Sequence, residues 1–112
     1  MKRAPNYDDV MPLTEREVRI LVALCSAKNM SGYNIGRQVE EDAGKNMVMG
    51  NGTLRPALDR LDKYGMIENV GVDKSRPGLP ARIWRVTSQG RMILEWELAS
   101  YRRLVRLGEG RL

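Results

Sequence analysis

Residues 52–61 read Gly-Thr-Leu-Arg-Pro-Ala-Leu-Asp-Arg-Leu and carry the clearest helical stripe of the chain. The apolar members of this stripe fall at i, i+3, i+4 and i+7, the spacing of one helix face. They are Leu54, Ala57, Leu58 and Leu61. Pro56 lacks an N–H and fits the first turn of a helix, so we place the helix start near Thr53. Gly65 follows the stripe and predicts a left-handed cap at the helix end.

A first helix is predicted upstream of this one. Thr14 is a suitable N-cap, and Glu17, three residues later, completes a capping box. Apolar residues recur at helical spacing from Val18 onward, which predicts a largely buried helix that ends near Lys28. Cys25 falls on the same face as these apolar residues, so we expect it to be an inert thiol in the core.

A second, shorter helix is predicted between Ser31, a suitable N-cap, and Gly44, a suitable stop. Between this helix and the next, residues 47–49 are apolar, which is compatible with a short strand or with a loop. Three residues are too few to distinguish these two interpretations.

Two strand-like segments, residues 66–73 and 81–86, follow the third helix. A Pro-Gly pair lies between them and indicates a turn, so the two segments predict a hairpin with a long loop. Thr87 then caps a final helix, which we expect to run to about Leu107.

This order of elements is typical of a winged helix-turn-helix, in which the second and third helices form the helix-turn-helix and the hairpin is the wing. We therefore predict a mainly α fold with a small β-hairpin (α+β) and an added C-terminal helix. The expected segments are a flexible N-terminal arm (1–12), a winged-helix domain (13–86), a C-terminal helix (87–107) and a tail (108–112).

The composition excludes most enzymatic chemistry. The 112 residues include one cysteine and no histidine, and 19 Lys and Arg against 14 Asp and Glu give a formal net charge of +5. Without histidine, Ser-His and Cys-His nucleophiles and the common zinc sites are excluded. The longest apolar run, residues 20–25, is far shorter than the roughly 20 residues of a membrane span, and no signal peptide is evident. We expect a cytoplasmic, non-enzymatic protein without a cofactor, metal site or membrane contact.

The distribution of charge favours DNA as the partner. The predicted wing, residues 74–85, contains four basic side chains and no acid, which suits contact with phosphates. The outward face of the third helix is also basic, and small polar residues stand at its N-terminal end, where side chains can reach bases. The candidate contacts here are Asn51, Thr53, Arg55, Arg60, Lys63, Lys74, Arg76 and Arg82. The alternative is a merely solvated face, because Asp59, Asp62 and Glu68 dilute the positive charge.

Three segments carry motifs that occur together in one protein family. Residues 52–61, followed by Gly65, resemble a G-T-L-Y-P-x-L-x-x-L helix and its terminal glycine. Residues 31–35 resemble the helix opening H-G-Y-x-I, and residues 78–90 resemble the strand-to-helix passage G-x-P-x-x-x-Y-x-L-T-x-x-G. In this order, and over residues 13 to about 107, the chain resembles the PadR family of winged-helix transcriptional regulators.

The resemblance implies that Ser31 and Tyr33, at the opening of the second helix, also lie at the DNA. Two departures from the family pattern stand out: Arg55 replaces the signature tyrosine, and Ser31 replaces the usual histidine. An arginine keeps affinity for phosphate and adds a preference for guanine, which would alter the operator. Trp84 takes the place of the aromatic residue in the second wing strand, and we expect it to pack in the core.

The C-terminal helix predicts a homodimer. Its apolar arc covers more than half of the helix, whereas a single packing partner accounts for an arc of about 100°. The resemblance points the same way, because only 25 residues follow Thr87 and short family members dimerise through this one helix. The predicted interface residues are Ile93, Leu94, Leu98, Tyr101 and Val105. A dimer would bind a palindromic operator and act as a repressor.

Some short family members bind flat aromatic molecules between their C-terminal helices. By this resemblance, Trp96 and Met92 are candidates for contact with a small aromatic or hydrophobic effector, and the alternative is that Trp96 only fills packing space. A protein-interaction winged helix without sequence-specific DNA binding is the alternative to a DNA-binding regulator. The basic wing argues against it, because a protein-docking face more often exposes aromatic residues or leucines.

Overall fold

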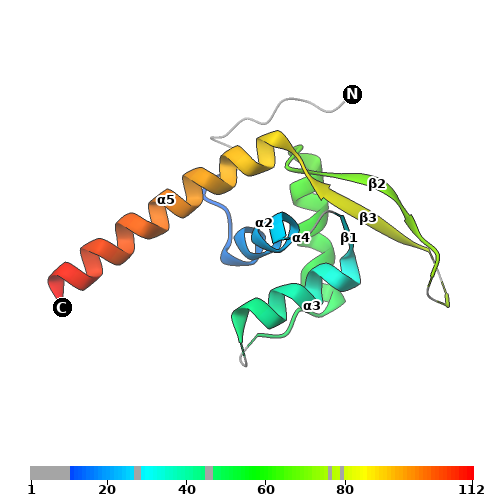
Figure 1. Ribbon diagram of the computed structural model, residues 1–112, viewed down its shortest axis with the longest axis horizontal. Helices are drawn as coiled ribbons and strands as arrows, with labels where there is room; N and C mark the ends of the chain where they lie inside the picture. The colour runs from blue at the N-terminus through cyan, green and yellow to red at the C-terminus, as the bar shows by residue number, and fades with distance from the viewer. Residues whose placement is uncertain (1–10, 27–28, 45–46, 76, 79) are drawn as a thin grey trace.

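The structure is a computed structural model that describes residues 11–26, 29–44, 47–75, 77–78 and 80–112. This part of the chain forms helices and short strands in the order α2 (Glu15–Ser26), β1 (Met30–Ser31), α3 (Gly32–Ala43), α4 (Asn51–Lys63), β2 (Ile67–Asp73), β3 (Ala81–Val86) and α5 (Ser88–Arg111) (Figure 1). The predicted mainly α fold, with a hairpin wing and an added C-terminal helix, is confirmed.

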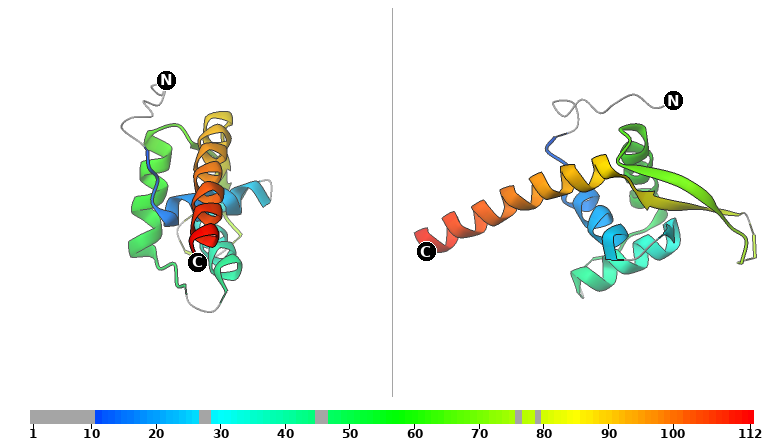
Figure 2. Two further views of the ribbon diagram at one scale, coloured as in Figure 1. Left: turned by 90° about the vertical axis from the view of Figure 1, so that its left-hand side faces the viewer. Right: turned by 45° about the horizontal axis from the view of Figure 1, so that its top comes forward.

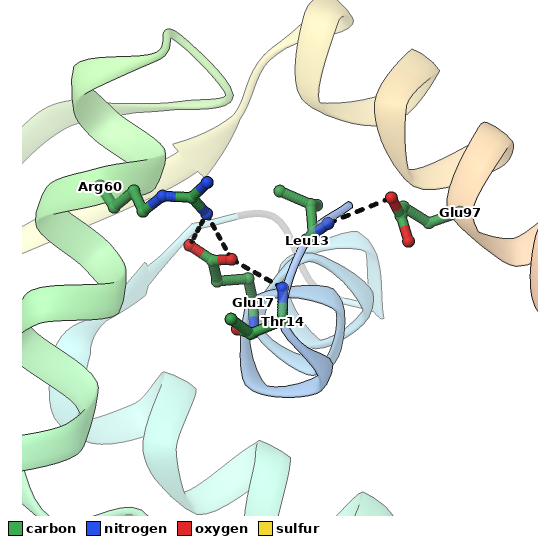
Figure 3. Close-up of polar contacts among 5 residues, drawn as sticks. All are labelled: Leu13, Thr14, Glu17, Arg60 and Glu97. Carbon is green, nitrogen blue, oxygen red and sulfur yellow. Dashed lines mark hydrogen bonds and ion pairs between the residues drawn. The ribbon is translucent and has the colours of Figure 1, made fainter. Parts of the chain in front are cut away.

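The predicted capping box begins α2. The hydroxyl of Thr14 accepts a hydrogen bond from the N–H of Glu17 at 3.1 Å, and the Glu17 carboxylate accepts one from the N–H of Thr14 at 2.8 Å. The same carboxylate, which is buried, pairs with the guanidinium of Arg60 on α4 at 2.5 Å. Close by, the N–H of Leu13 donates to the buried carboxylate of Glu97 on α5 at 3.2 Å (Figure 3). Two buried acids therefore tie the start of α2 to α4 and to α5.

The three strands form one antiparallel sheet with β3 in the centre, in the order β1-β3-β2. Strand β1 was not predicted, since two residues are too few for a period-2 pattern. In the sheet, Met30 of β1 lies opposite Trp84 of β3. The apolar residues 47–49, for which the sequence was compatible with a strand or a loop, lie outside any strand. Trp84 on the central strand is buried, as predicted, and belongs to the hydrophobic core.

Helix α4 begins two residues earlier than predicted. Gly50 is its N-cap and Asn51 its first residue, so Pro56 lies in the second turn and not in the first. A proline there cannot donate to the carbonyl of Gly52, but its ring is exposed and the helix continues past it. The predicted glycine cap is confirmed, because Gly65 has a φ of 75° and its N–H donates to the carbonyl of Asp62 at 3.0 Å.

Side chains from every helix meet in one core. Ile20 from α2, Ile35 from α3, Leu61 from α4 and Ile93 from α5 are all completely buried. Cys25, in contrast, is exposed near the end of α2, so the prediction that it packs in the core was wrong. The apolar stripe of α2 is broad, and Ile20, Leu21 and Leu24 fill the core without it.

The hairpin and α5 extend in opposite directions from the helical body (Figures 1 and 2). Helix α5 runs to Arg111, four residues beyond the end predicted near Leu107. Its first turns pack on the body, where Ile93, Leu94 and Glu97 are buried, while every residue from 99 onward is exposed. The second half of α5 therefore projects into solvent in the single chain.

The junction of β3 with α5 explains the glycine of the T-x-x-G passage. The N–H of Thr87 donates to the carbonyl of Met66 at 3.0 Å, and its hydroxyl donates to the carbonyl of Gly65 at 2.6 Å. Both bonds pull the start of α5 onto the end of α4. A Cβ atom on Gly90 would overlap the carbonyl oxygen of Met66, so only glycine fits at this position.

We predict that Gly90→Ala lowers the free energy of unfolding by about 2 kcal/mol or more, because the Met66 carbonyl is held by Thr87 and cannot move away. The matched control is Gly108→Ala on the same helix, where a Cβ meets no described atom within 4 Å. This control should be neutral or stabilising by about 0.5–1 kcal/mol. Urea unfolding followed by circular dichroism measures both, and equal stability of the two variants would contradict the close approach.

Candidate nucleic-acid interface

A groove of about 420 Å³ lies where the start of α3, the outward face of α4 and the base of the wing meet. Its described lining is Gly32, Tyr33, Leu54, Arg55, Leu58, Asp59, Pro80, Ala81, Arg82 and Trp84. Three of the predicted DNA contacts, Tyr33, Arg55 and Arg82, come from three different elements and meet here with exposed side chains. The fold thus gathers one phenol and two guanidinium groups along a single surface.

Tyr33 stands at the start of α3 and is 48% exposed. Its hydroxyl accepts a hydrogen bond from Nη1 of Arg37 at 3.2 Å, and the guanidinium carbon lies 5.8 Å from the ring centroid. This hydrogen bond is the main cause of a raised pKa for Arg37. Arg37 was missed in the sequence, although its i, i+4 spacing from Tyr33 was a usable signal.

Arg55 projects from the first half of α4 and is exposed in the groove. Asp59 lies one turn later on the same side of the helix and is 59% exposed. The outward face of α4 thus offers hydrogen-bond donors from Arg55 and an acceptor from Asp59, which are the two kinds of group that read base edges.

The positive charge of the wing is smaller than the sequence suggested. Arg82 pairs with Asp59 at 3.9 Å and stacks over the ring of Trp84, with 5.1 Å between its guanidinium carbon and the ring centroid. Arg85 pairs with Glu68, its partner across the β2–β3 ladder. The prediction of four basic residues without an acid was true of residues 74–85 alone, and the adjacent strand and helix supply the missing acids.

Three predicted DNA contacts have other positions in the structure. Ser31 is buried, and its hydroxyl accepts the N–H of Asn34 at 3.3 Å as the N-cap of α3, so its assignment as a DNA contact was wrong. Arg60 pairs with the buried Glu17 carboxylate and is not among the described residues that line the groove, so its contact with DNA stays a prediction. Lys63 is exposed but belongs to the last turn of α4, where its ammonium lies 5.5 Å from the ring centroid of Tyr64.

The remaining candidates are Asn51, Thr53, Lys74 and Arg76. Asn51 and Thr53 belong to the first turn of α4, and Thr53 is half-buried. Lys74 is exposed beyond the end of β2. Arg76 lies outside the described residues. Thr53 and Lys74 are not among the described residues that line the groove.

The predicted dimer residues divide into two sets. Ile93 and Leu94 fill the core of their own chain and have no surface to offer a partner, so their assignment to the interface was wrong. Leu98 is half-buried at the edge of the core, whereas Tyr101 and Val105 are exposed. These last three line an open hollow of about 380 Å³ on α5.

The predicted effector contacts lie elsewhere on α5. Trp96 is exposed and Met92 is half-buried. Trp96 and Leu98 are two positions apart along α5. At about 100° per residue, this places them on nearly opposite sides of the helix. Neither Trp96 nor Met92 lines the hollow formed by Leu98, Tyr101 and Val105.

The described residues contain no group of three or more His, Cys, Asp or Glu placed to hold a metal ion. None of their helices is long and apolar enough to cross a bilayer.

The model of the Transcriptional regulator PadR-like family matches residues 20–96. No curated protein matches the chain. The fold is similar to that of a transcriptional regulator from Clostridium thermocellum (TM-score 0.72, 19% identity, 85% of this chain and 87% of that chain) and of a PadR family regulator from Clostridium difficile (0.71, 22%, 87% and 97%). It is also similar to Bacillus subtilis PadR in complex with operator DNA (0.65, 23%, 78% and 48%). At these identities the likeness shows a shared fold.

We predict that Arg60→Ala lowers the free energy of unfolding by about 2 kcal/mol, because it leaves the buried Glu17 carboxylate without its cation. The expected loss is smaller than for a fully buried ion pair, because the Arg60 side chain is 35% exposed and solvent screens its charge. The control is Lys63→Ala on the same helix, expected to change stability by less than about 0.5 kcal/mol. Chemical unfolding of both variants makes the comparison, and equal stabilities would show that Arg60 is not a structural residue.

Proposed function

Because the chain belongs to the PadR-like family of transcriptional regulators, we propose that it binds a palindromic operator as a homodimer and represses transcription. The observation that carries the proposal is the groove in which Tyr33, Arg55 and Arg82 meet. In this proposal, α4 enters the major groove of DNA, Arg55 contacts bases, and the wing follows the phosphate backbone. The transcription regulators among the similar structures, and the absence of histidine, support a role other than catalysis.

The charge of the molecule supports binding to a polyanion. The formal net charge is +5. Two basic side chains that do not line the groove, Arg37 on α3 and Lys74 just after β2, are also exposed. Phosphate contacts of this kind supply most of the affinity for duplex DNA and orient the protein on it. Base contacts from α4 would then select the sequence.

The dimer in this proposal forms through the second half of α5. Tyr101, Leu104, Val105 and Leu107 are exposed apolar residues on one projecting helix, which is unusual for a monomer in water. A second copy that covers this surface would also supply a second groove. Two such grooves suit half-sites about 34 Å apart, one turn of B-DNA.

A small aromatic or hydrophobic effector would act at the same helices. Trp96 is 46% exposed and carries a flat apolar ring, and half-buried Met92 lies one helical turn before it. A ligand held between two copies of α5 would change the distance between the two grooves. In this way occupancy would release the operator, which is the regulatory part of the proposal.

The DNA part is tested on a duplex selected by the protein from a random pool. Affinity should fall steeply with salt, and the selected sequence should be palindromic. Arg55→Ala should weaken binding to the selected duplex by about tenfold, the value of one good base contact, and weaken binding to unrelated DNA much less.

The control is Arg103→Ala, which removes an exposed arginine on the projecting half of α5. A salt-independent affinity, or no selection from the pool, would refute the DNA-binding function and favour a protein-interaction module. Equal losses on selected and unrelated duplexes for Arg55→Ala would show that this residue contacts phosphate only.

The dimer is tested by Val105→Glu. Val105 is 56% exposed beyond the core, so the substitution should leave the fold intact and shift the mass in solution from twice the chain mass of 12.7 kDa toward the monomer. Ala99→Glu adds the same charge at an exposed position on another side of α5 and should leave the mass unchanged. Sedimentation measures both variants, and a dimer that persists with Val105→Glu would place the interface elsewhere.

A further inference from the structure

The acid in the groove has a defined partner. Asp59 is the only acidic residue among the described residues that line the groove, and its Oδ1 lies 3.9 Å from Nη2 of Arg82. Arg82 is also held from another side, because its guanidinium stacks over the ring of Trp84. Trp84 is buried and fixed in the central strand, so this stacking gives Arg82 a defined position opposite α4.

The pairing with Asp59 neutralises the charge of Arg82, which could otherwise bind a DNA phosphate. The groove contains two guanidinium groups, those of Arg55 and Arg82. Asp59 forms an ion pair with the second of these. A phosphate that binds Arg82 must compete with the Asp59 carboxylate, and the carboxylate then faces the negative DNA without a counter-charge. The two side chains are 46% and 59% exposed, so the pair is weak enough to open.

Other acids near the groove lack this position. Glu68 is paired with Arg85 on the sheet, and Asp62 is half-buried one turn further along α4 and does not line the groove. Asp59, in contrast, stands one turn after Arg55 on the face that the proposed function directs into the major groove. There a carboxylate can accept a hydrogen bond from the amino group of cytosine.

We propose that Asp59 is a specificity-determining residue that exchanges Arg82 for a cytosine amino group. On an operator with cytosine at the matching position, the amino group replaces Arg82 as the partner of Asp59, and Arg82 is free to bind phosphate. On unrelated DNA no donor replaces Arg82, so the protein loses either that phosphate contact or the pairing of Asp59. The inference rests on the proposed DNA-binding function.

The test compares Asp59→Asn with Asp42→Asn, which removes the same charge at an exposed position on α3 that does not line this groove. Affinity is measured for the selected operator and for an unrelated duplex over a range of salt. For Asp59→Asn, affinity for unrelated DNA should rise about threefold. Its salt dependence should steepen by about one phosphate contact, and discrimination should fall. Asp42→Asn should keep the discrimination of the unaltered protein.

Two further measurements identify the route. In an Arg82→Ala background, Asp59→Asn should no longer raise affinity for unrelated DNA, and a rise that persists would overturn the exchange with Arg82. Selection from a random pool should show a cytosine preference that Asp59→Asn loses or converts to adenine, the base that asparagine pairs with. An unchanged preference would overturn the contact with cytosine.

Failure of this inference is distinct from failure of the proposed function. If the unaltered protein selects no duplex, both are wrong. If it selects an operator but Asp59→Asn behaves like Asp42→Asn, the DNA-binding function stands and the role of Asp59 is refuted.

Discussion

The buried carboxylate of Glu17 is the interaction on which the rest of the arrangement depends. It accepts the Thr14 N–H at the start of α2 and the guanidinium of Arg60 on α4, so one side chain both begins a helix and fixes its neighbour. A buried charge is stable only when it is paired, and this requirement allows little rotation of α4 about its axis. With Arg60 turned inward, Arg55 and Asp59 face the groove.

The elements that depend on local chemistry could be predicted from the sequence. The capping box of α2, the apolar stripe of α4 and the caps at Ser31 and Gly65 are all where residue types and spacing place them. Strand β1 could not be predicted, because it has only two residues and its pairing partner, β3, lies about 50 residues away in the chain. The start of α4 was misplaced because Pro56 is tolerated in the second turn, where its exposed ring meets no obstacle that the sequence reveals.

The candidate site was predicted less completely. Helical spacing shows which residues share a face, but it does not show which acidic side chains from other elements will pair with them. Arg55 and Arg60 are both basic residues of α4, yet the second is taken by an acid 43 residues away in the chain. The same holds for Arg82, whose acid is on a different element. Pairing over such distances is decided by tertiary packing. The sequence therefore placed Tyr33, Arg55 and Arg82 on one surface, and the structure brings them together, but it overestimated the free positive charge of that surface.

The helical body covers part of the apolar face of α5, so only the rest of that face is available to a second chain. Leu94, Leu98, Tyr101 and Val105 continue one face, but the body covers the first of these, partly covers the second, and leaves the last two open. In the proposed dimer the partner can therefore contact only the projecting half. The grooves lie beyond the opposite end of this helix, so a small change in the angle between two copies of α5 would move them by a larger distance. In the proposed dimer, this lever geometry would make the distance between the two grooves sensitive to a ligand bound between the helices.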